Sequence, residues 1–280
     1  MKRARLILES IARPGWFNMA ADSHLADQIL QGDLAPAIRF YQWSPPAVSL
    51  GYHQTPAAVD LNACRELGWE VVRRPTGGRA LLHLHDLSYS VTMPYPVNQV
   101  QGLKPLYRKI ASAISFGIHD LGLSEEDKNG DGVPIASSSR LVRGVCLQTR
   151  VRGELTIGGR KVAAAAQRLA RNGILQHGSI LVTGDAGAIA SVAPIPPDQR
   201  PGLAQELRQR ACSLELLKSG SVKVSDLIEV LCRRFAEMLE LRFEATGWTS
   251  NEIAAISGLR SKFEVKTDAR PKNGVAVVTA

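Results

Sequence analysis

A glycine-rich stretch flanked by arginines is the first feature of the chain that could do chemistry. Residues 73–80 read Arg-Arg-Pro-Thr-Gly-Gly-Arg-Ala and directly follow a run that predicts a strand. Adjacent glycines such as Gly77 and Gly78 let a ligand approach backbone N–H groups, and guanidinium groups nearby add fixed positive charge. The stretch lacks the GxxxxGK[ST] pattern of a nucleotide-binding P-loop. On its own it is consistent with either a binding loop or a tight turn.

A cysteine and a lysine at the two ends of one segment are the second feature. Cys146 precedes Lys161 by fifteen residues, and a Gly-Gly pair at 158–159 predicts that the chain folds back between them. This fold would bring an ammonium group towards a thiol, and a positive charge favours the thiolate. A thiolate is the nucleophile of acyl transfer through a thioester. The alternative for Cys146 is a packing role, which we expect for the remaining cysteines, Cys64, Cys212 and Cys232.

Three residues of metal-ligand type follow the glycine-rich stretch, namely His83, His85 and Asp86. In one continuous strand the two histidines would share a face and Asp86 would point to the other face. The cysteines form no CxxC pair of the kind that zinc sites use. We therefore expect neither a metal ion nor a disulfide.

Apolar periodicity and turn residues predict the elements that position these groups. Helices are expected over residues 16–31, 60–67, 103–121 and 226–240, and strands at the start of the chain and over 37–43, 47–52, 69–74, 86–93, 154–162 and 178–182. Ser225 is expected as an N-cap, and Thr249 with Glu252 as the capping box of a further helix. Hairpins interspersed with helices predict an α+β fold with mixed or antiparallel sheets flanked by helices.

The composition is that of an ordinary globular protein. The chain has 280 residues, 45% of them hydrophobic, and carries 34 basic and 26 acidic side chains for a net charge of +8. No apolar run reaches the ~18 residues of a membrane span, and Glu9 and Arg13 interrupt the apolar region that a signal peptide would need. We expect a cytoplasmic monomer that binds neither nucleic acid nor membrane. Its scattered positive charge suits acidic protein partners.

Two longer motifs resemble those of a known superfamily. Residues 73–83, followed by Leu-Ser-Tyr-Ser-Val at 87–91, are similar to the acyl-binding loop of the lipoate–protein ligase A/B and biotin–protein ligase superfamily. Residues 159–167 and 173–181 resemble its second motif, and the resemblance extends over roughly 5–265. It implies the biotin/lipoate ligase catalytic-domain fold.

The resemblance also implies a domain organisation. The catalytic domain would cover residues 1–245, and residues 246–280 would form a C-terminal helix and tail that packs on it or trails from it.

Within this superfamily the chain is most similar to the single-domain, ligase-like octanoyltransferases. The spacing of Cys146 and Lys161 matches the nucleophile and lysine of those enzymes, whereas the Asn-Asp pair of ligases is replaced by Glu154 and Leu155. The resemblance implies transfer of an octanoyl group from octanoyl-acyl carrier protein to a lysine of a lipoyl-domain protein, such as the glycine-cleavage H protein. The reaction would pass through a thioester on Cys146 and require no cofactor.

The same motifs imply which residues bind the acyl group. They are Arg73, Arg74, Gly77, Gly78, Arg79, His83, Tyr89, His177 and Gly178. The chain departs from the usual pattern at Ala164 and Ala165, where Gly-Ser is common, and at Asp86, where Glu is common. These departures bear on the length of the acyl chain and on the partner protein more than on the class of reaction.

Three alternative functions remain open from the sequence. An amidotransferase would also use a cysteine thioester but would move octanoyl between lipoyl-domain proteins. An ATP-dependent lipoate ligase would use Lys161 and the arginine-rich loop to hold the adenylate phosphate. A non-catalytic member that only binds lipoyl domains would need neither Cys146 nor Lys161, so their presence argues against it.

Overall fold

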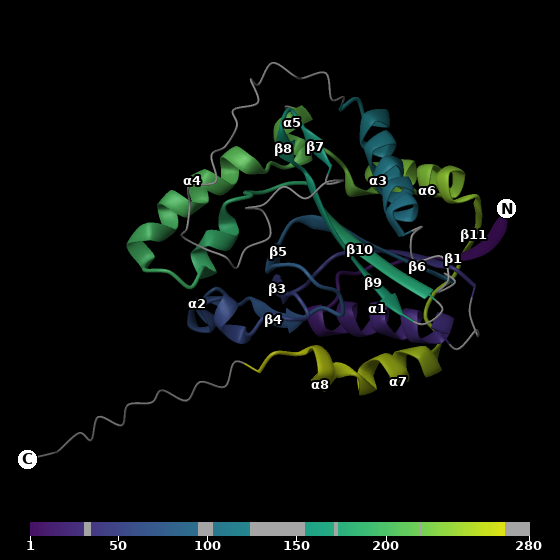
Figure 1. Ribbon diagram of the computed structural model, residues 1–280, viewed down its shortest axis with the longest axis horizontal. Coiled ribbons are helices and arrows are strands. Elements are labelled where there is room, and N and C mark those ends of the chain that lie inside the picture. The colour runs from purple at the N-terminus through teal and green to yellow at the C-terminus, as the bar shows by residue number, and fades with distance from the viewer. Residues whose placement is uncertain (31–34, 95–102, 124–154, 171–172, 219, 267–280) are drawn as a thin grey trace, which may run out of the picture.

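The computed structural model describes residues 1–30, 35–94, 103–123, 155–170, 173–218 and 220–266. Among these residues, one six-stranded sheet has the strand order β11-β1-β2-β6-β10-β9 (Figure 1). Its strands are β1 (Lys2–Leu8), β2 (Ala37–Tyr41), β6 (Asp86–Pro94), β9 (Ala163–Ala170), β10 (Gly173–Leu181) and β11 (Leu241–Ala245). Strands β11, β1 and β2 run parallel, and the pairs from β2 through β6 and β10 to β9 are antiparallel.

A smaller sheet and a hairpin complete the β-structure of the described residues. The small sheet has the order β4-β3-β5, with β3 (Ala47–Leu50), β4 (Glu70–Arg73) and β5 (Leu81–His83). The hairpin joins β7 (Thr156–Ile157) to β8 (Arg160–Lys161). Because β3 is parallel to β4 and antiparallel to β5, both sheets are mixed. The predicted α+β class is confirmed.

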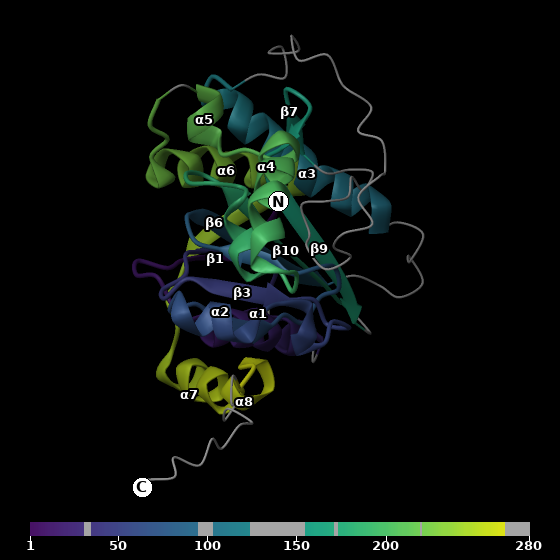
Figure 2. The same ribbon diagram turned by 90° about the vertical axis from the view of Figure 1, so that its left-hand side faces the viewer.

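Helices cover both faces of the large sheet. They are α1 (Gly15–Leu30), α2 (Leu61–Glu66), α3 (Leu103–Asp120), α4 (Arg200–Arg210), α5 (Leu214–Lys218), α6 (Val224–Leu239), α7 (Ser250–Gly258) and α8 (Arg260–Phe263), with short 3₁₀ turns η1 (Pro56–Ala58), η4 (Ala188–Val192) and η5 (Pro197–Gln199). Helices α3 and α6 lie on one face and α1 on the other, and α7 and α8 lie beyond α1 (Figures 1 and 2). The polar groups of the candidate site lie on the α1 side.

The core between the sheet and α3 follows from the periodicity of the sequence. The apolar side chains of α3 that recur every fourth residue, Leu106, Ile110, Ile114 and Ile118, are all buried, as predicted. They belong to one core cluster with Phe235 of α6 and with apolar side chains of the sheet face that α3 and α6 cover. Each such side chain contributes roughly 1.5–3 kcal/mol when fully buried.

Two expectations about helix starts had different outcomes. Helix α7 begins at the predicted capping box, in which Thr249 and Glu252 satisfy each other's backbone N–H groups. Ser225 is not an N-cap, because α6 begins one residue earlier, at Val224, with Lys223 in the cap position. The Ser225 hydroxyl donates to the Asp226 carboxylate instead.

Residues after 245 pack on α1 and on the small sheet. Trp248 lies edge-on to Phe17 of α1, and the Val265 N–H donates to the Val71 carbonyl. The division of the chain into residues 1–245 and 246–280 stays a prediction.

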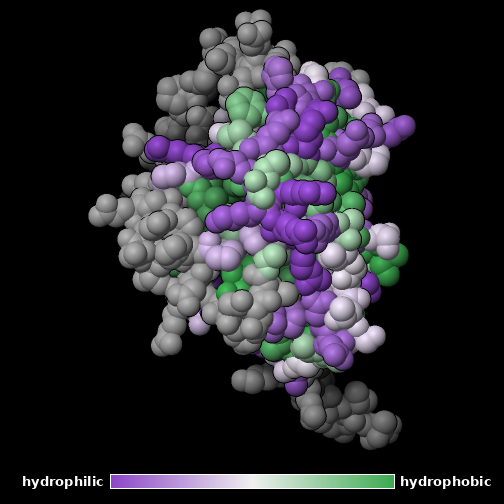
Figure 3. Space-filling view, turned by 90° about the vertical axis from the view of Figure 1, so that its right-hand side faces the viewer, coloured by the Kyte–Doolittle hydropathy of each residue, from purple (hydrophilic) through white to green (hydrophobic). Residues whose placement is uncertain are grey.

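The surface near the sheet edge is strongly polar. Hydrophilic side chains form a broad band over the face on which β1 and β11 lie (Figure 3). Within the described part of the chain, no helix is long and apolar enough to cross a membrane. The expected cytoplasmic location stays a prediction.

Candidate active site

Two adjoining cavities are lined by β5 of the small sheet and by β9 and β10 of the large sheet. One, of about 440 Å³, is here called the histidine cavity because His83 and His177 line it. The other, of about 560 Å³, is called the lysine cavity because Lys161 lines it. The two share three lining residues, Leu81, Ala164 and Ser179. Both volumes include space that is open to solvent.

The structure brings most of the predicted site residues to these cavities. The histidine cavity is lined by Arg74, Gly78, His83, His177 and Gly178, among others. Lys161 lies in the wall of the lysine cavity. The remaining predicted residues of the described chain, Arg73, Gly77, Arg79 and Tyr89, line neither cavity. The predicted nucleophile Cys146 lies outside the described residues.

The guanidinium group of Arg74 holds the glycine-rich loop in place. Only 6% of Arg74 is exposed, and its N–H groups donate to the carbonyls of Gly77, Arg79 and Ser49, each at 2.8 Å. Gly78 adopts a φ of +97°, which favours glycine. The loop is thus a rigid part of the cavity wall.

Arg73 makes a second set of backbone contacts. Its Nη1 donates to the carbonyls of Gly51 and Tyr52, at 3.3 and 3.1 Å, and also to that of Gln54. These contacts join the end of β4 to the turn that follows β3. Both arginines therefore act on the backbone around the loop.

His83 is held between a carboxylate, a hydroxyl and an aromatic ring. Its Nδ1 lies 2.9 Å from Asp86 Oδ2, and its Nε2 lies 2.8 Å from Ser49 Oγ. The imidazole stacks on Trp43 with ring centroids 3.8 Å apart. The Ser179 hydroxyl also donates to Asp86 Oδ2, at 2.6 Å. His83 is therefore fixed in position in the cavity wall.

The contact between His83 and Asp86 corrects a sequence-based expectation. One continuous strand through residues 83–86 would have placed the two side chains on opposite faces. Instead β5 ends at His83, the chain bends at residues 84–85, and β6 begins at Asp86. Within the described residues, no group of three or more His, Cys, Asp or Glu side chains is placed to hold a metal ion.

The surroundings of Asp86 keep its carboxyl group ionised. Burial is the largest influence and by itself would raise the pKa of Asp86. The attraction of His83, together with hydrogen bonds from His83, Ser179 and Ser88, outweighs burial and lowers this pKa. The ionised Asp86 accepts a hydrogen bond from His83 Nδ1–H, and His83 Nε2 faces the Ser49 hydroxyl.

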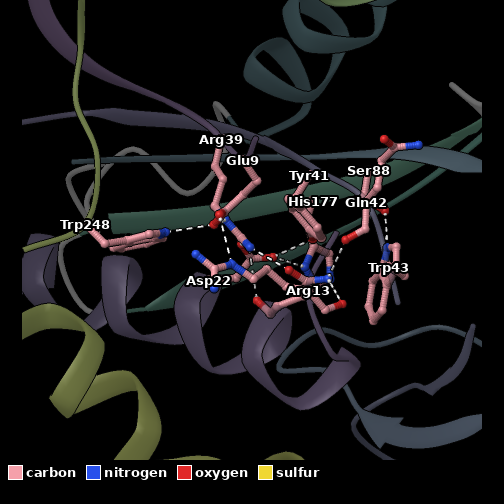
Figure 4. A network of polar contacts seen from close by, with 11 residues as sticks. Glu9, Arg13, Asp22, Arg39, Tyr41, Gln42, Trp43, Ser88, His177 and Trp248 are labelled. Atoms are coloured by element: carbon pink, nitrogen blue, oxygen red, sulfur yellow. Dashed lines mark hydrogen bonds and ion pairs between the residues drawn. The ribbon is translucent and has the colours of Figure 1, made fainter. Parts of the chain in front are cut away.

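A second buried carboxylate orients His177 (Figure 4). His177 Nδ1 lies 3.0 Å from Asp22 Oδ2, and its Nε2 contacts the Thr76 hydroxyl in the glycine-rich loop. Burial, with the nearby charge of Arg74, lowers the pKa of His177, although Asp22 opposes this shift. His177 is therefore neutral at pH 7 and donates from Nδ1. This contact ties β10 and the loop to α1.

Asp22 is itself the centre of a network that extends away from the cavities. Arg39 Nη1 donates to Asp22 Oδ1 at 3.1 Å, and the Tyr41 hydroxyl donates to Oδ2 at 2.8 Å. Arg39 Nε also contacts Glu9 Oε1 at 3.1 Å, and Trp248 Nε1 donates to the same oxygen at 2.7 Å (Figure 4). Burial alone would raise the pKa of Asp22, but the His177 hydrogen bond and the Arg39 charge lower it overall.

Tyr89 faces the other side of the sheet from the two histidines. Its ring lies 5.8 Å from that of Phe235 in the core beneath α6, and only 1% of the residue is exposed. A Cβ on Gly178 would lie 2.6 Å from the Tyr89 hydroxyl and 2.6 Å from the Ala164 carbonyl oxygen. Tyr89 therefore supports the strand that carries His177, and Gly178 makes room for it.

The predicted hairpin places Lys161 beside the lysine cavity. Gly158 and Gly159 have φ values of +55° and +75°, as a primed two-residue turn requires. Lys161 is 4% exposed, and its carbonyl accepts from the Cys212 N–H at 3.0 Å. The hairpin is confirmed in its described part, residues 155–162.

The three described cysteines lack the environment of a nucleophile. Burial raises the pKa of Cys64 and of Cys232 to about 11, and it also raises that of Cys212. A raised pKa disfavours the thiolate at neutral pH. All three are packing residues, as the sequence predicted, although Cys212 lies between helices rather than within one.

Sequence reasoning missed the residues that orient the histidines, namely Asp22, Arg39, Tyr41, Trp43 and Ser49. One sign of them is present in the sequence, because Asn18 and Asp22 interrupt an otherwise apolar helix stripe at a spacing of four. Both are fully buried in the structure. Buried polar residues need hydrogen-bond partners, so an isolated pair of this kind marks a network.

Comparison with known proteins gives the family. The sequence pattern described as the lipoyl protein ligase A/B catalytic domain matches residues 14–236. The octanoyltransferase LipM of Moorella thermoacetica is 32% identical over 263 residues, covering 92% of this chain and 94% of that protein. The octanoyltransferase LipM of Geobacillus kaustophilus is 34% identical over 269 residues, covering 90% of this chain and 92% of that protein.

Solved structures show the same fold. An archaeal bipartite lipoate protein ligase, studied with its E2 lipoyl domain from Thermoplasma acidophilum, is 22% identical and has a TM-score of 0.73 over 96% of this chain and 95% of that chain. A lipoate-protein ligase A bound with ATP is 23% identical, with a TM-score of 0.70 over 93% of this chain and 95% of that chain. The expected ligase-type catalytic fold is confirmed, and the chain belongs to the lipoyl protein ligase A/B catalytic-domain family.

Proposed function

We propose that this protein is an octanoyltransferase of lipoate biosynthesis, which transfers octanoyl from octanoyl-acyl carrier protein to a lysine of a lipoyl-domain protein. The observation that carries the proposal is the similarity to octanoyltransferases along nearly the whole length of both chains. The enzyme is an acyltransferase. The two cavities and the position of Lys161 supply a physical account of how the reaction would proceed.

The histidine cavity is suited to the acyl chain. Met19, Tyr41 and Trp43 line it together with alanines of β9 and the glycine-rich loop. Burial of a methylene group contributes about 0.8 kcal/mol, so burial of six of them would contribute roughly 5 kcal/mol. This free energy of burial, which a short acyl group would lack, is large enough to favour octanoyl over short acyl groups.

The covalent step would use Cys146 and Lys161. The Cys146 thiolate attacks the thioester carbonyl, its new C–S bond replaces the donor's C–S bond, and the donor leaves as a thiol after taking up a proton. The acceptor lysine, as a neutral amine, then attacks the acyl-enzyme; the amide C–N bond forms as the C–S bond to Cys146 breaks, and the amine gives up one proton to the departing sulfur. The ammonium of Lys161 in the cavity wall would favour the thiolate and stabilise the oxyanion.

The positions of the arginines favour this reaction over ATP-dependent ligation. A ligase of this kind would need cationic groups for an adenylate phosphate. Arg73 and Arg74 each direct their N–H groups to three backbone carbonyls. Turning the Arg74 guanidinium towards a phosphate would leave its three carbonyls without these donors, whereas the contacts of Arg73 involve Nη1 alone. The structure thus gives the loop arginines a role that requires no nucleotide.

The net charge of +8 is suited to acidic partners. Acyl carrier proteins and lipoyl domains are usually acidic, so the same positive surface would serve the donor and the acceptor. The interaction would then weaken as salt screens the charges. We propose that the enzyme acts as a monomer.

Intact-protein mass spectrometry tests the proposal. The protein is mixed with octanoyl-acyl carrier protein without ATP, beside a Cys146→Ala variant and a Cys64→Ala control. An octanoyl adduct of roughly 126 Da on the wild type and on the Cys64 variant, absent from the Cys146 variant, is expected. Absence of the adduct from all three would refute the proposal.

The donor is tested separately from the chemistry. An amidotransferase would form the same adduct from an octanoylated H protein but not from octanoyl-acyl carrier protein. A ligase would form no adduct on itself, and would modify a lipoyl domain only with lipoate and ATP together.

A further inference from the structure

We propose that the lysine cavity binds the thiol-side arm of the acyl donor, a pantetheine-like chain that carries amides and a branched aliphatic group. This inference rests on the proposed function, because it concerns the second half of the same thioester substrate. It assigns to the two cavities the two halves of one molecule, with the reacting carbonyl between them.

The shared wall of the two cavities carries the inference. Leu81, Ala164 and Ser179 line both cavities, so the cavities lie side by side across these residues. A thioester has one arm on each side of its carbonyl carbon. If the octanoyl arm occupies the histidine cavity, the carbonyl lies near the shared wall and the sulfur arm continues into the lysine cavity. Lys161, in the wall of that second cavity, would then lie near the carbonyl group.

The lining of the lysine cavity matches the chemistry of such an arm. Aliphatic side chains make up much of the wall, including Leu82, Leu84, Leu181 and Ile189. Thr183 adds a hydroxyl group that could hydrogen-bond to an amide. An uncharged chain that alternates short aliphatic segments with two amides is suited to this kind of surface, in which a small number of polar groups lie in an apolar wall.

A nucleotide fits the same cavity less well. Asp185 places a carboxylate in its wall, and the partner of that carboxylate, Arg208, binds it through two contacts of 2.9 and 2.6 Å. Among the described lining residues, Lys161 is the only lysine or arginine. A polyphosphate would therefore face one cation and one carboxylate in this cavity.

The cavity wall around residues 183–186 is held in a defined conformation. Gly184 has a φ of +83°, and a Cβ there would lie 2.9 Å from the His85 ring. The Asp185 carboxylate accepts from the Gly187 N–H at 2.8 Å as well as from Arg208. This turn packs against the bend after β5, so the cavity has a fixed outline.

Two donors that differ only in the length of the thiol arm test the inference. Octanoyl-pantetheine carries the full arm, and octanoyl-N-acetylcysteamine carries only its first segment. Leu84→Trp narrows the lysine cavity, and Leu84 does not line the histidine cavity. Leu67→Trp is the matched control, because Leu67 is 47% exposed and lines neither cavity. Acyl-enzyme formation is followed by mass spectrometry at several donor concentrations.

We expect Leu84→Trp to raise KM for octanoyl-pantetheine by about tenfold and to leave KM for the short donor within about twofold. Leu67→Trp should change neither value. Equal effects of Leu84→Trp on both donors, or no effect on either, would overturn the inference while leaving the proposed function intact. Failure of the wild type to form an adduct from octanoyl-acyl carrier protein, run alongside, would instead refute the proposed function, and the inference with it.

Discussion

Replacement of Asp22 by asparagine tests whether the buried network is central to the stability of the site. Asp22 is completely buried and accepts hydrogen bonds from three groups, on Arg39, Tyr41 and His177. An asparagine has the same shape but only one acceptor oxygen, so its NH₂ group must face one of these donors. Arg39, also fully buried, would keep Glu9 as its remaining carboxylate partner.

The expected loss follows from the burial of the charges. Removal of one partner from a buried ion pair costs about 3–5 kcal/mol, because the remaining charge is left without compensation. The Glu9 contact retained by Arg39 places our expectation at the lower end, about 3 kcal/mol. For a chain of this size such a loss lowers the melting temperature by roughly 5 °C.

Urea unfolding followed by circular dichroism measures this free energy, with Glu244→Gln as the control. Glu244 pairs with Arg3 at 3.4 Å, but the two side chains are 53% and 77% exposed. An exposed pair contributes at most about 1 kcal/mol. If Asp22→Asn destabilised the protein no more than Glu244→Gln, the network would not hold α1, β2 and β10 together as argued.

Three further predictions concern the site. Lys161→Ala should slow formation of the octanoyl adduct by about a hundredfold or more without unfolding the protein. Quench-flow mixing followed by mass spectrometry would measure the rate of adduct formation. Gly178→Ala should reduce the free energy of unfolding by about 2 kcal/mol because its Cβ would overlap Tyr89, whereas Gly77→Ala, with no atom within 4 Å of its Cβ, should have little effect. The pKa of buried His177 lies below the usual 6.5, so the unfolded chain takes up a proton at a higher pH than the folded protein does. The free energy of unfolding should therefore fall as the pH drops through about 6.5. In urea unfolding, His177→Gln should reduce this dependence on pH.

The elements that sequence predicted best are those with a strong local pattern. Helix α3 has apolar residues at every fourth position, and the hairpin has a glycine pair at its turn. Helix α4 was missed because Leu203 and Leu207 are its only buried residues, so that its apolar stripe is too narrow to detect. Strand β9 was missed because its alanine-rich sequence has no strand propensity, and its pairing with β10 determines its conformation.

The candidate site was predictable only in part, because its decisive contacts join distant residues. The motifs identified the loop and both histidines. They could not show that Arg74 turns back onto Ser49, or that His177 pairs with Asp22, residues separated by 25 and 155 positions. Periodicity reveals which face of an element is buried, but not which element packs against it. The assignment of Tyr89 to the substrate shows the same limit, since its ring lies on the opposite face of the sheet.

The paired polar groups explain how a cavity with so many polar side chains can receive an alkyl chain. Ser88 donates to Asp86 and accepts from Trp43 Nε1, at 2.8 and 2.9 Å. Both ring nitrogens of each histidine contact protein partners. His83 contacts Asp86 and Ser49, and His177 contacts Asp22 and Thr76. A polar group that is already hydrogen-bonded loses little when water leaves the cavity.

This pairing also gives the carboxylates a role distinct from catalysis. Each carboxylate orients one histidine through Nδ1, and Nε2 of each ring contacts a hydroxyl group of the wall. Without Asp22 or Asp86, an unpaired imidazole would need water inside the cavity, and that water would compete with the acyl chain for space. The same water would be a nucleophile close to the thioester that we propose. In the proposed reaction, a cavity wall without such water would favour transfer over hydrolysis.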